Sequence, residues 1–190
     1  MNINTLFPIP IAYNQVSELL ADKVENLIVN RLNKLERAET QYTDFFLEDK
    51  IVDINRELPD LFSEILQLRD FFETETSFLS SRKDFQYWIQ DYRSDKDSHT
   101  IHAHGMYGIS GVYWIRANEN AGMLKFENPN PYMYYQDNAG TGNPFAFHDA
   151  QFPTQRGVIL MFPSYLKHEV LKGNEGIIRT TLAFNFGKAE

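Results

Sequence analysis

Residues 102–115 read HAHGMYGISGVYWI, and this stretch indicates the class of fold. From Tyr107 to Ile115 it is rich in β-branched and aromatic residues and contains glycines, a composition that favours a short, largely buried β-strand. Just before that strand, His102 and His104 stand two positions apart. Side chains at positions i and i+2 of a strand point to the same face, so the two imidazoles can converge on one metal ion.

More short strands follow along the chain. Residues 122–126 form a short apolar segment, residues 158–162 (VILMF) have the composition of a buried strand, and residues 177–186 (IIRTTLAFNF) alternate in part. Between them, residues 128–152 are rich in Pro, Gly, Asn and Tyr, which is typical of a long loop. Short strands separated by such segments favour a sandwich or barrel, so the second half of the chain is predicted to be β-rich.

The first half of the chain has helical patterns instead. Residues 14–36 and 54–79 carry apolar residues close to helical spacing, although Pro59 leaves the bounds of the second helix open. Residues 6–11 (LFPIPI) predict a short edge strand, because proline cannot donate a hydrogen bond to a sheet. We therefore predict a single domain over residues 1–190, mainly β with flanking helices (α+β), in which a helical part of about 1–84 packs on a β core of about 85–190.

Composition narrows the classes of partner and compartment. The net charge of −8 and the lack of a Lys/Arg-rich run disfavour binding to duplex nucleic acid, which relies on phosphate contacts. With no cysteine, the chain has no disulfide, zinc–thiolate site, Fe–S cluster or cysteine nucleophile. No signal peptide or membrane-spanning apolar run is evident, so we expect a cytoplasmic protein without a membrane partner.

A third histidine follows a predicted strand and turn. His168 ends the segment GVILMFPSYLKH, which can return its imidazole to the end of the barrel where His102 and His104 lie. An H-x-H pair alone also fits two ordinary surface histidines, but the third imidazole favours a metal site. His99 would face the other way in a continuous strand and is the poorer candidate. The candidate catalytic and metal-binding residues are therefore His102, His104 and His168.

The last predicted strand has a polar face and an apolar face. Arg179, Thr181, Ala183 and Asn185 share one face by strand alternation. A polar face inside a small barrel needs partners, because a buried charge is costly unless it is paired. A dicarboxylate would supply them through a bidentate pair with Arg179 and a hydrogen bond from Thr181. The alternative is a solvated face on which Arg179 makes a surface ion pair.

The order of these motifs resembles a known family. It is similar to the 2-oxoglutarate/Fe(II) oxygenases of bacteria and their phages, whose pattern runs H-x-H, S-G-V-Y-Y, F-x-D-P, L-F-P-S, H-x-V and R-x-S-x-x-F-N. The matching elements here are Trp88, His102-Ala-His104, Ile109-Ser-Gly-Val-Tyr113, Phe126-Glu-Asn-Pro129, residues 157–164 (GVILMFPS), His168 and residues 179–185 (RTTLAFN).

The resemblance implies a double-stranded β-helix (jelly-roll, cupin-like) core and a dioxygenase that uses Fe(II) and the cosubstrate 2-oxoglutarate. It implies that His102 and His168 bind the iron and that Arg179 binds the distal carboxylate of 2-oxoglutarate. Thr181 keeps a hydroxyl where the family pattern has serine. Tyr113 and Asn185 are further cofactor-binding candidates.

Three positions depart from the expected patterns. Trp114 replaces the second tyrosine of S-G-V-Y-Y, and Asn128 replaces the aspartate of F-x-D-P. His104 stands where most members of the wider superfamily have a carboxylate ligand. The third ligand is therefore either His104 or one of the carboxylates Glu127, Asp137 and Asp149, and another metal such as zinc remains an alternative to iron.

Two other functions are compatible with the sequence: a cupin-type metal enzyme that does not use 2-oxoglutarate, and a jelly-roll binding module without catalysis. Arg179 distinguishes the first of these from the oxygenase. The substrate is left open as a small molecule or a peptide, and so is a homodimer. His148 and Asp149 lie in the long loop that covers the substrate in one interpretation, and Tyr107 and Trp114 are candidate pocket walls.

Overall fold

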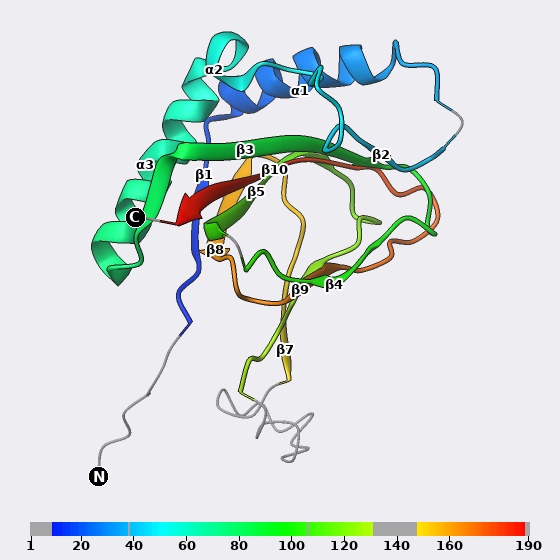
Figure 1. The fold of residues 1–190 in the computed structure, drawn as a ribbon. Coiled ribbons are helices and arrows are strands. Elements are labelled where there is room, and N and C mark those ends of the chain that lie inside the picture. The colour runs from blue at the N-terminus through cyan, green and yellow to red at the C-terminus, as the bar shows by residue number, and fades with distance from the viewer. Residues whose placement is uncertain (1–8, 38, 106, 131–147, 189–190) are drawn as a thin grey trace.

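The computed structural model describes residues 9–37, 39–105, 107–130 and 148–188, and Figure 1 shows helices on one side of paired strands. In chain order the elements are β1 (Ala12–Gln15), α1 (Glu18–Leu32), β2 (Tyr42–Thr43), α2 (Ile54–Glu57), α3 (Pro59–Thr76), β3 (Ser80–Tyr92), β4 (His99–His102), β5 (Tyr107–Ala117), β6 (Leu124–Glu127), β7 (Asp149–Phe152), β8 (Val158–Pro163), β9 (His168–Val170) and β10 (Arg179–Lys188).

Within the described residues the strands form two antiparallel sheets. A six-stranded sheet has the order β1-β8-β5-β10-β3-β2, and a four-stranded sheet has the order β4-β9-β6-β7. From β3 onward the chain passes repeatedly between the two sheets, which is the winding of a double-stranded β-helix. The predicted fold class is therefore confirmed.

Two apolar clusters hold the layers together. One lies between the helices and the six-stranded sheet and joins buried residues of α1 and α3, such as Ile28 and Ile65, to Leu182 and Phe184 of β10. The other lies between the two sheets and includes Trp114 and Phe162. Because β3, β5 and β8 contribute to both clusters by alternation, their register decides which side chains face the space between the sheets.

The helices begin and end at different residues from those predicted. The segment 54–79 is divided into α2 and α3, with Pro59 in the first turn of α3, where its missing N–H costs no hydrogen bond. The helix predicted over 14–36 is shorter, because Asn14 and Gln15 pair with β8 and Ser17 caps α1 by accepting a hydrogen bond from the N–H of Leu20.

The strand bounds differ as well. The predicted edge strand at residues 6–11 is replaced by β1, which begins at Ala12, and residues 1–8 lie outside the described part of the chain. The β core begins at Ser80, earlier than the predicted residue of about 85. Of the predicted loop over 128–152, residues 149–152 form β7, and 131–147 lie outside the described residues.

A buried carboxylate fixes the end of β10 on which the site depends. Asp91 of β3 is fully buried and accepts hydrogen bonds from the hydroxyl of Thr180 and from Arg37 and Arg93. Burial disfavours its charged form, but Thr180 and the neighbouring arginines hold the pKa of Asp91 below its usual range. Thr180 is thereby held on the outer face of the sheet, so that Arg179 and Thr181 on either side of it point between the sheets.

Gly111 of β5 offers a test of this packing. A Cβ added there would lie 2.3 Å from the ring of Phe184 and 2.7 Å from the main-chain oxygen of Leu160. Gly111→Ala should therefore lower the free energy of unfolding of the metal-free protein by about 1–3 kcal/mol in urea titrations. Gly105→Ala is the matched control, since no atom lies within 4 Å of a Cβ built at that position. Equal stability of the two variants would contradict the packing described here.

Candidate metal centre

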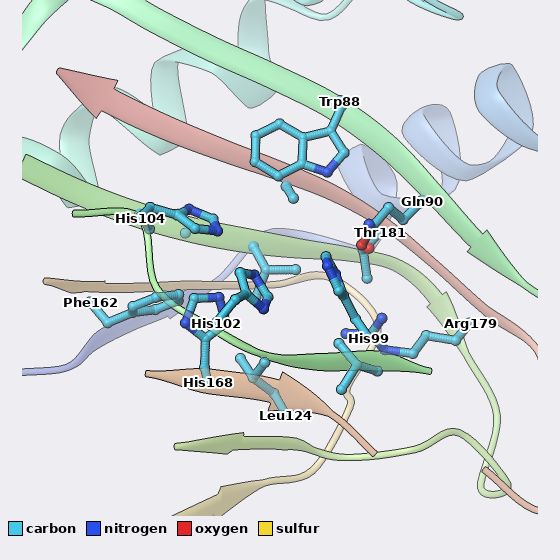
Figure 2. A pocket seen from close by; sticks show the side chains of 15 residues that line it. Trp88, Gln90, His99, His102, His104, Leu124, Phe162, His168, Arg179 and Thr181 are labelled. Atoms are coloured by element: carbon cyan, nitrogen blue, oxygen red, sulfur yellow. Dashed lines mark hydrogen bonds between the residues drawn. The ribbon is translucent and has the colours of Figure 1, made fainter. Parts of the chain in front are cut away.

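Three histidines meet where the two sheets face each other. His102 ends β4, His104 follows in the connection to β5, and His168 begins β9, where its Cα pairs with that of His102. One ring nitrogen of each residue lies within 4.8 Å of the other two. Figure 2 shows the three rings converging on one space, which is the arrangement that a metal ion requires.

Hydrogen bonds fix the tautomer of all three rings. The Nδ1 of His102 lies 2.7 Å from the main-chain oxygen of Thr100, and the Nδ1 of His168 lies 2.9 Å from that of Leu166. A carbonyl can only accept, so both Nδ1 atoms must carry the proton. The Nδ1 of His104 lies 2.7 Å from Oδ1 of Asn185, which also accepts from the hydroxyl of Ser110. All three Nε2 atoms are thus left with a free lone pair for a metal.

Burial favours the uncharged form of two of these rings, His104 and His168. It lowers the pKa of His168 to about 3, and it also lowers the pKa of His104, although the hydrogen bond to Asn185 opposes this. A neutral imidazole is the form that binds a metal ion. The electrostatic environment and the hydrogen bonds therefore favour the same state of the site.

His99 also belongs to this site, contrary to the prediction that it faces away. Its ring stacks on that of His102, with centroids 4.2 Å apart and an interplanar angle of 21°. The pairing of β4 with β9 is irregular between His99 and His102, so strict alternation does not apply. In Figure 2 His99 lies between His102 and Arg179, and burial lowers its pKa to about 4.

The pocket extends from the histidines to a buried arginine. Arg179 and Thr181 line it together with Ala183, as expected from the alternation of β10. The side chain of Arg179 is only 1% exposed, and within the described residues its Nε and Nη1 have no hydrogen-bond partner. Burial lowers the pKa of Arg179 to about 10, which leaves it charged at neutral pH. The guanidinium faces the pocket 5.4 Å from the ring of Tyr92, and no carboxylate of the described residues pairs with it.

The remaining predicted residues have different surroundings. Tyr113 points to the opposite face of β5, into the cluster against the helices, so the structure does not bring it to the pocket. Asn185 contacts His104 instead of the deep end of the pocket near Arg179. Tyr107 and Trp114 do not line the pocket, but the indole Nε1 of Trp114 is buried without a partner among the described residues.

The described carboxylates do not join the histidine cluster. Glu127 and Asp149 are paired across β6 and β7, where they lie near Lys167 and Lys125, respectively. His148 contributes its main-chain oxygen to the N–H of Asn128 and is likewise outside the cluster. Asp137 lies outside the described residues. Among the described residues, His104 is therefore the third group beside His102 and His168.

Comparison with known proteins adds a family match. A family model described as "Putative 2OG-Fe(II) oxygenase" matches residues 86–185, more than half of the 190 residues. No curated protein matches the sequence. Separately, no helix among the described residues is long and apolar enough to cross a membrane.

Several solved structures share the fold. A Pseudomonas putida prolyl-4-hydroxylase is similar with a TM-score of 0.63 at 15% identity, over 96% of this chain and 94% of that one. A Trichoplax adhaerens prolyl hydroxylase, in complex with a hypoxia inducible factor oxygen degradation domain peptide fragment, has a TM-score of 0.61 at 10% identity, over 94% and 83% of the two chains. A 2OG-Fe(II) oxygenase family oxidoreductase from Burkholderia pseudomallei has a TM-score of 0.60 at 13% identity, over 94% and 84%.

Asn185 provides a test of the histidine cluster that leaves the three rings in place. Asn185→Ala removes the acceptor for the Nδ1–H of His104. Loss of such a partner should weaken Zn(II) binding by about 10- to 100-fold, measured by calorimetric titration. Asn185→Asp keeps an acceptor and should retain affinity, and Asn14→Ala, on the exposed strand β1, is the control. Unchanged affinity in Asn185→Ala would argue against His104 as a ligand.

Proposed function

Because the chain belongs to the 2OG-Fe(II) oxygenase family, we propose that His102, His104 and His168 hold its Fe(II) and that Arg179 and Thr181 bind 2-oxoglutarate. The protein is an Fe(II)- and 2-oxoglutarate-dependent dioxygenase whose substrate is unknown. Membership of this family disfavours a cupin that does not use 2-oxoglutarate and a non-catalytic jelly-roll module. The observation that carries the site assignment is that one pocket holds both a three-imidazole cluster and a buried arginine without a hydrogen-bond partner among the described residues.

The histidine cluster suits a divalent metal ion. Three neutral imidazoles present free Nε2 lone pairs, and the acceptors behind them prevent the rings from turning. Three protein ligands leave positions on the metal open for a cosubstrate. Because none of the three ligands is anionic, the metal keeps its full positive charge, which favours an anionic cosubstrate and disfavours tight retention of the metal on its own.

The opposite end of the pocket suits a carboxylate. The Nε and Nη1 of Arg179, which have no partner in the described part of the chain, can donate hydrogen bonds, and Thr181 adds a hydroxyl from the same face of β10. Leaving the guanidinium buried and unpaired is costly, so a dicarboxylate that reaches both the metal and Arg179 would remove this cost. The indole N–H of Trp114, on the strand beside Thr181, is a further buried donor without a partner among the described residues.

When bound, Fe(II) supplies the reaction of 2-oxoglutarate with O₂ that oxidises the substrate. Arg179 and Thr181 orient the cosubstrate along β10, and the apolar side chains of Leu124, Phe162 and Val170 exclude water from it. Asn185 and the main-chain acceptors keep the protons of the three imidazoles on Nδ1. Trp88 and Gln90 of β3 form the wall across from the histidines (Figure 2). The substrate would approach the metal along this wall.

Arg179→Ala tests the cosubstrate site. The variant should lose on the order of 2–5 kcal/mol of 2-oxoglutarate binding, about 30-fold or more in affinity, because a buried charge-assisted pair is removed. The measurement is anaerobic addition of Fe(II) and then 2-oxoglutarate, followed by the weak visible charge-transfer band. Binding of Fe(II) alone should be unchanged, and Arg56→Ala, which alters an exposed arginine of α2, should behave as wild type. An unaltered 2-oxoglutarate affinity in Arg179→Ala would refute the assignment.

The identity of the third ligand is tested in parallel. His104→Ala should lower the affinity for Fe(II) about as much as His102→Ala, since each removes one of three ligands. His104→Asp should still bind Fe(II), because it restores the more common set of two histidines and a carboxylate. Glu127→Ala and Asp149→Ala are controls that should retain the metal. Full occupancy in His104→Ala, with loss in either control, would instead favour a carboxylate ligand.

A further inference from the structure

Beside the metal pocket, three consecutive apolar side chains face solvent. Phe45, Phe46 and Leu47, which we call the apolar ledge, are 42%, 86% and 48% exposed. Large apolar side chains clustered on a surface are typical of contact sites, because covering them removes apolar area from water. The ledge is therefore a candidate surface for a partner.

The loop that carries the ledge is held by hydrogen bonds at its base. The carboxylate of Asp44, only 1% exposed, accepts from the N–H groups of Ile89 and Ile51 at 2.6 and 2.9 Å. Lys50 donates to the main-chain oxygens of Asp44 and Phe45 at 2.7 and 3.0 Å. These bonds close the loop on itself and on β3, so the exposed aromatic rings are presented from an ordered support, which lowers the entropy cost of binding.

The ledge is joined to the pocket through edge-to-face contacts between aromatic rings. Phe45 contacts Phe46 on one side and Trp88 on the other, with ring centroids 4.8 and 4.9 Å away. Trp88 lines the metal pocket, and its ring lies 6.1 Å from that of His104. A molecule that covers the ledge would therefore lie next to the wall of the pocket that faces the histidines.

Strand β3, which pairs with β2 just before the ledge, has an edge that is only partly paired among the described residues. Within the described residues, β2 pairs only with Asp91 and Gln90 of β3, and the main chain of Asp44 extends this contact to Ile89. From Phe85 to Tyr87, no described strand pairs with that edge of β3, whereas residues 82–84 are bulged out of register with β10. Such an edge is a template for an added strand, and an extended peptide supplies the matching N–H and C=O groups.

The charges beside the ledge select the kind of peptide. Glu48 and Asp49 follow Leu47 directly, are exposed, and make no ion pair among the described residues. Together with the net charge of −8 they repel phosphate and attract cations. A nucleic acid is thus disfavoured, and a basic polypeptide is favoured.

We propose that the apolar ledge and the partly paired edge of β3 bind the substrate as an extended, lysine- or arginine-containing polypeptide segment. One apolar side chain of that segment packs on Phe45 and Phe46, and a neighbouring residue passes Trp88 towards the metal. A small metabolite held inside the pocket would leave the ledge exposed. This inference rests on the proposed function, because it takes the pocket beside Trp88 as the reaction site.

The test uses fluorescein-labelled peptides of about nine residues, the length of a long strand. They alternate lysine and threonine around a central leucine or tryptophan, and binding to the full chain is measured by fluorescence anisotropy. Phe46→Ser should weaken binding by about tenfold or more, as expected for an exposed aromatic contact residue. Leu19→Ser is the matched control, since Leu19 is 82% exposed on α1, and it should bind as wild type.

Two changes in the peptide test the chemistry of recognition. Replacing its lysines with glutamates should abolish binding through repulsion by Glu48 and Asp49, and N-methylation of alternate residues should abolish it by blocking the added strand. Equal binding by the N-methylated peptide, equal loss in Phe46→Ser and Leu19→Ser, or no binding of any peptide to the wild type would overturn the proposal.

A second measurement distinguishes failure of this proposal from failure of the proposed function on which it rests. In the anaerobic Fe(II) and 2-oxoglutarate complex, a peptide that reaches the pocket should shift the visible band of the wild type. Phe46→Ser should form the same band without peptide but show no shift when it is added. A bound peptide that leaves the band of the wild type unchanged would contradict a substrate role for this surface. Absence of the band in the wild type itself would instead contradict the proposed metal and cosubstrate site.

Discussion

Strand β10 lies between β3 and β5, and its register is the constraint on which the site depends. Leu182, Phe184 and Phe186 of this strand are buried against the helices. That burial fixes Arg179 and Thr181 on the opposite face, between the sheets. A slip of one residue would exchange the two faces, exposing apolar side chains to the pocket and placing the guanidinium in the core. The same apolar packing that stabilises the fold therefore also orients the polar groups of the site.

Strand alternation explains which parts of the site were predictable from the sequence. It correctly placed Arg179 and Thr181 on one face, and the spacing of His102 and His104 together with the turn before His168 indicated their convergence. It failed at His99, because β4 is irregular there and alternation holds only in a regular strand. The division of the second helix before Pro59 could not be fixed by periodicity, because the N-cap of α3 is Leu58, whose side chain makes no capping hydrogen bond.

Two further residues show the limits of assigning roles by motif. Tyr113 lies within a matched motif, yet its neighbour Val112 faces the pocket, and alternation therefore turns Tyr113 towards the helices. Asn185 was predicted to contact the cosubstrate but is bonded to the ring of His104, a long-range contact that a linear pattern does not specify. The motif located the pocket, whereas the role of each side chain depended on the direction in which it points.

The central claim is that one 2-oxoglutarate molecule binds both to a metal ion held by three histidines and to the buried Arg179. The most direct measurement is a crystal structure grown without oxygen in the presence of Fe(II) and 2-oxoglutarate. The account predicts one metal ion bound by Nε2 of His102, His104 and His168, with the distal carboxylate of 2-oxoglutarate paired with Arg179. A carboxylate side chain in place of His104, or a 2-oxoglutarate molecule that leaves Arg179 unpaired, would contradict it.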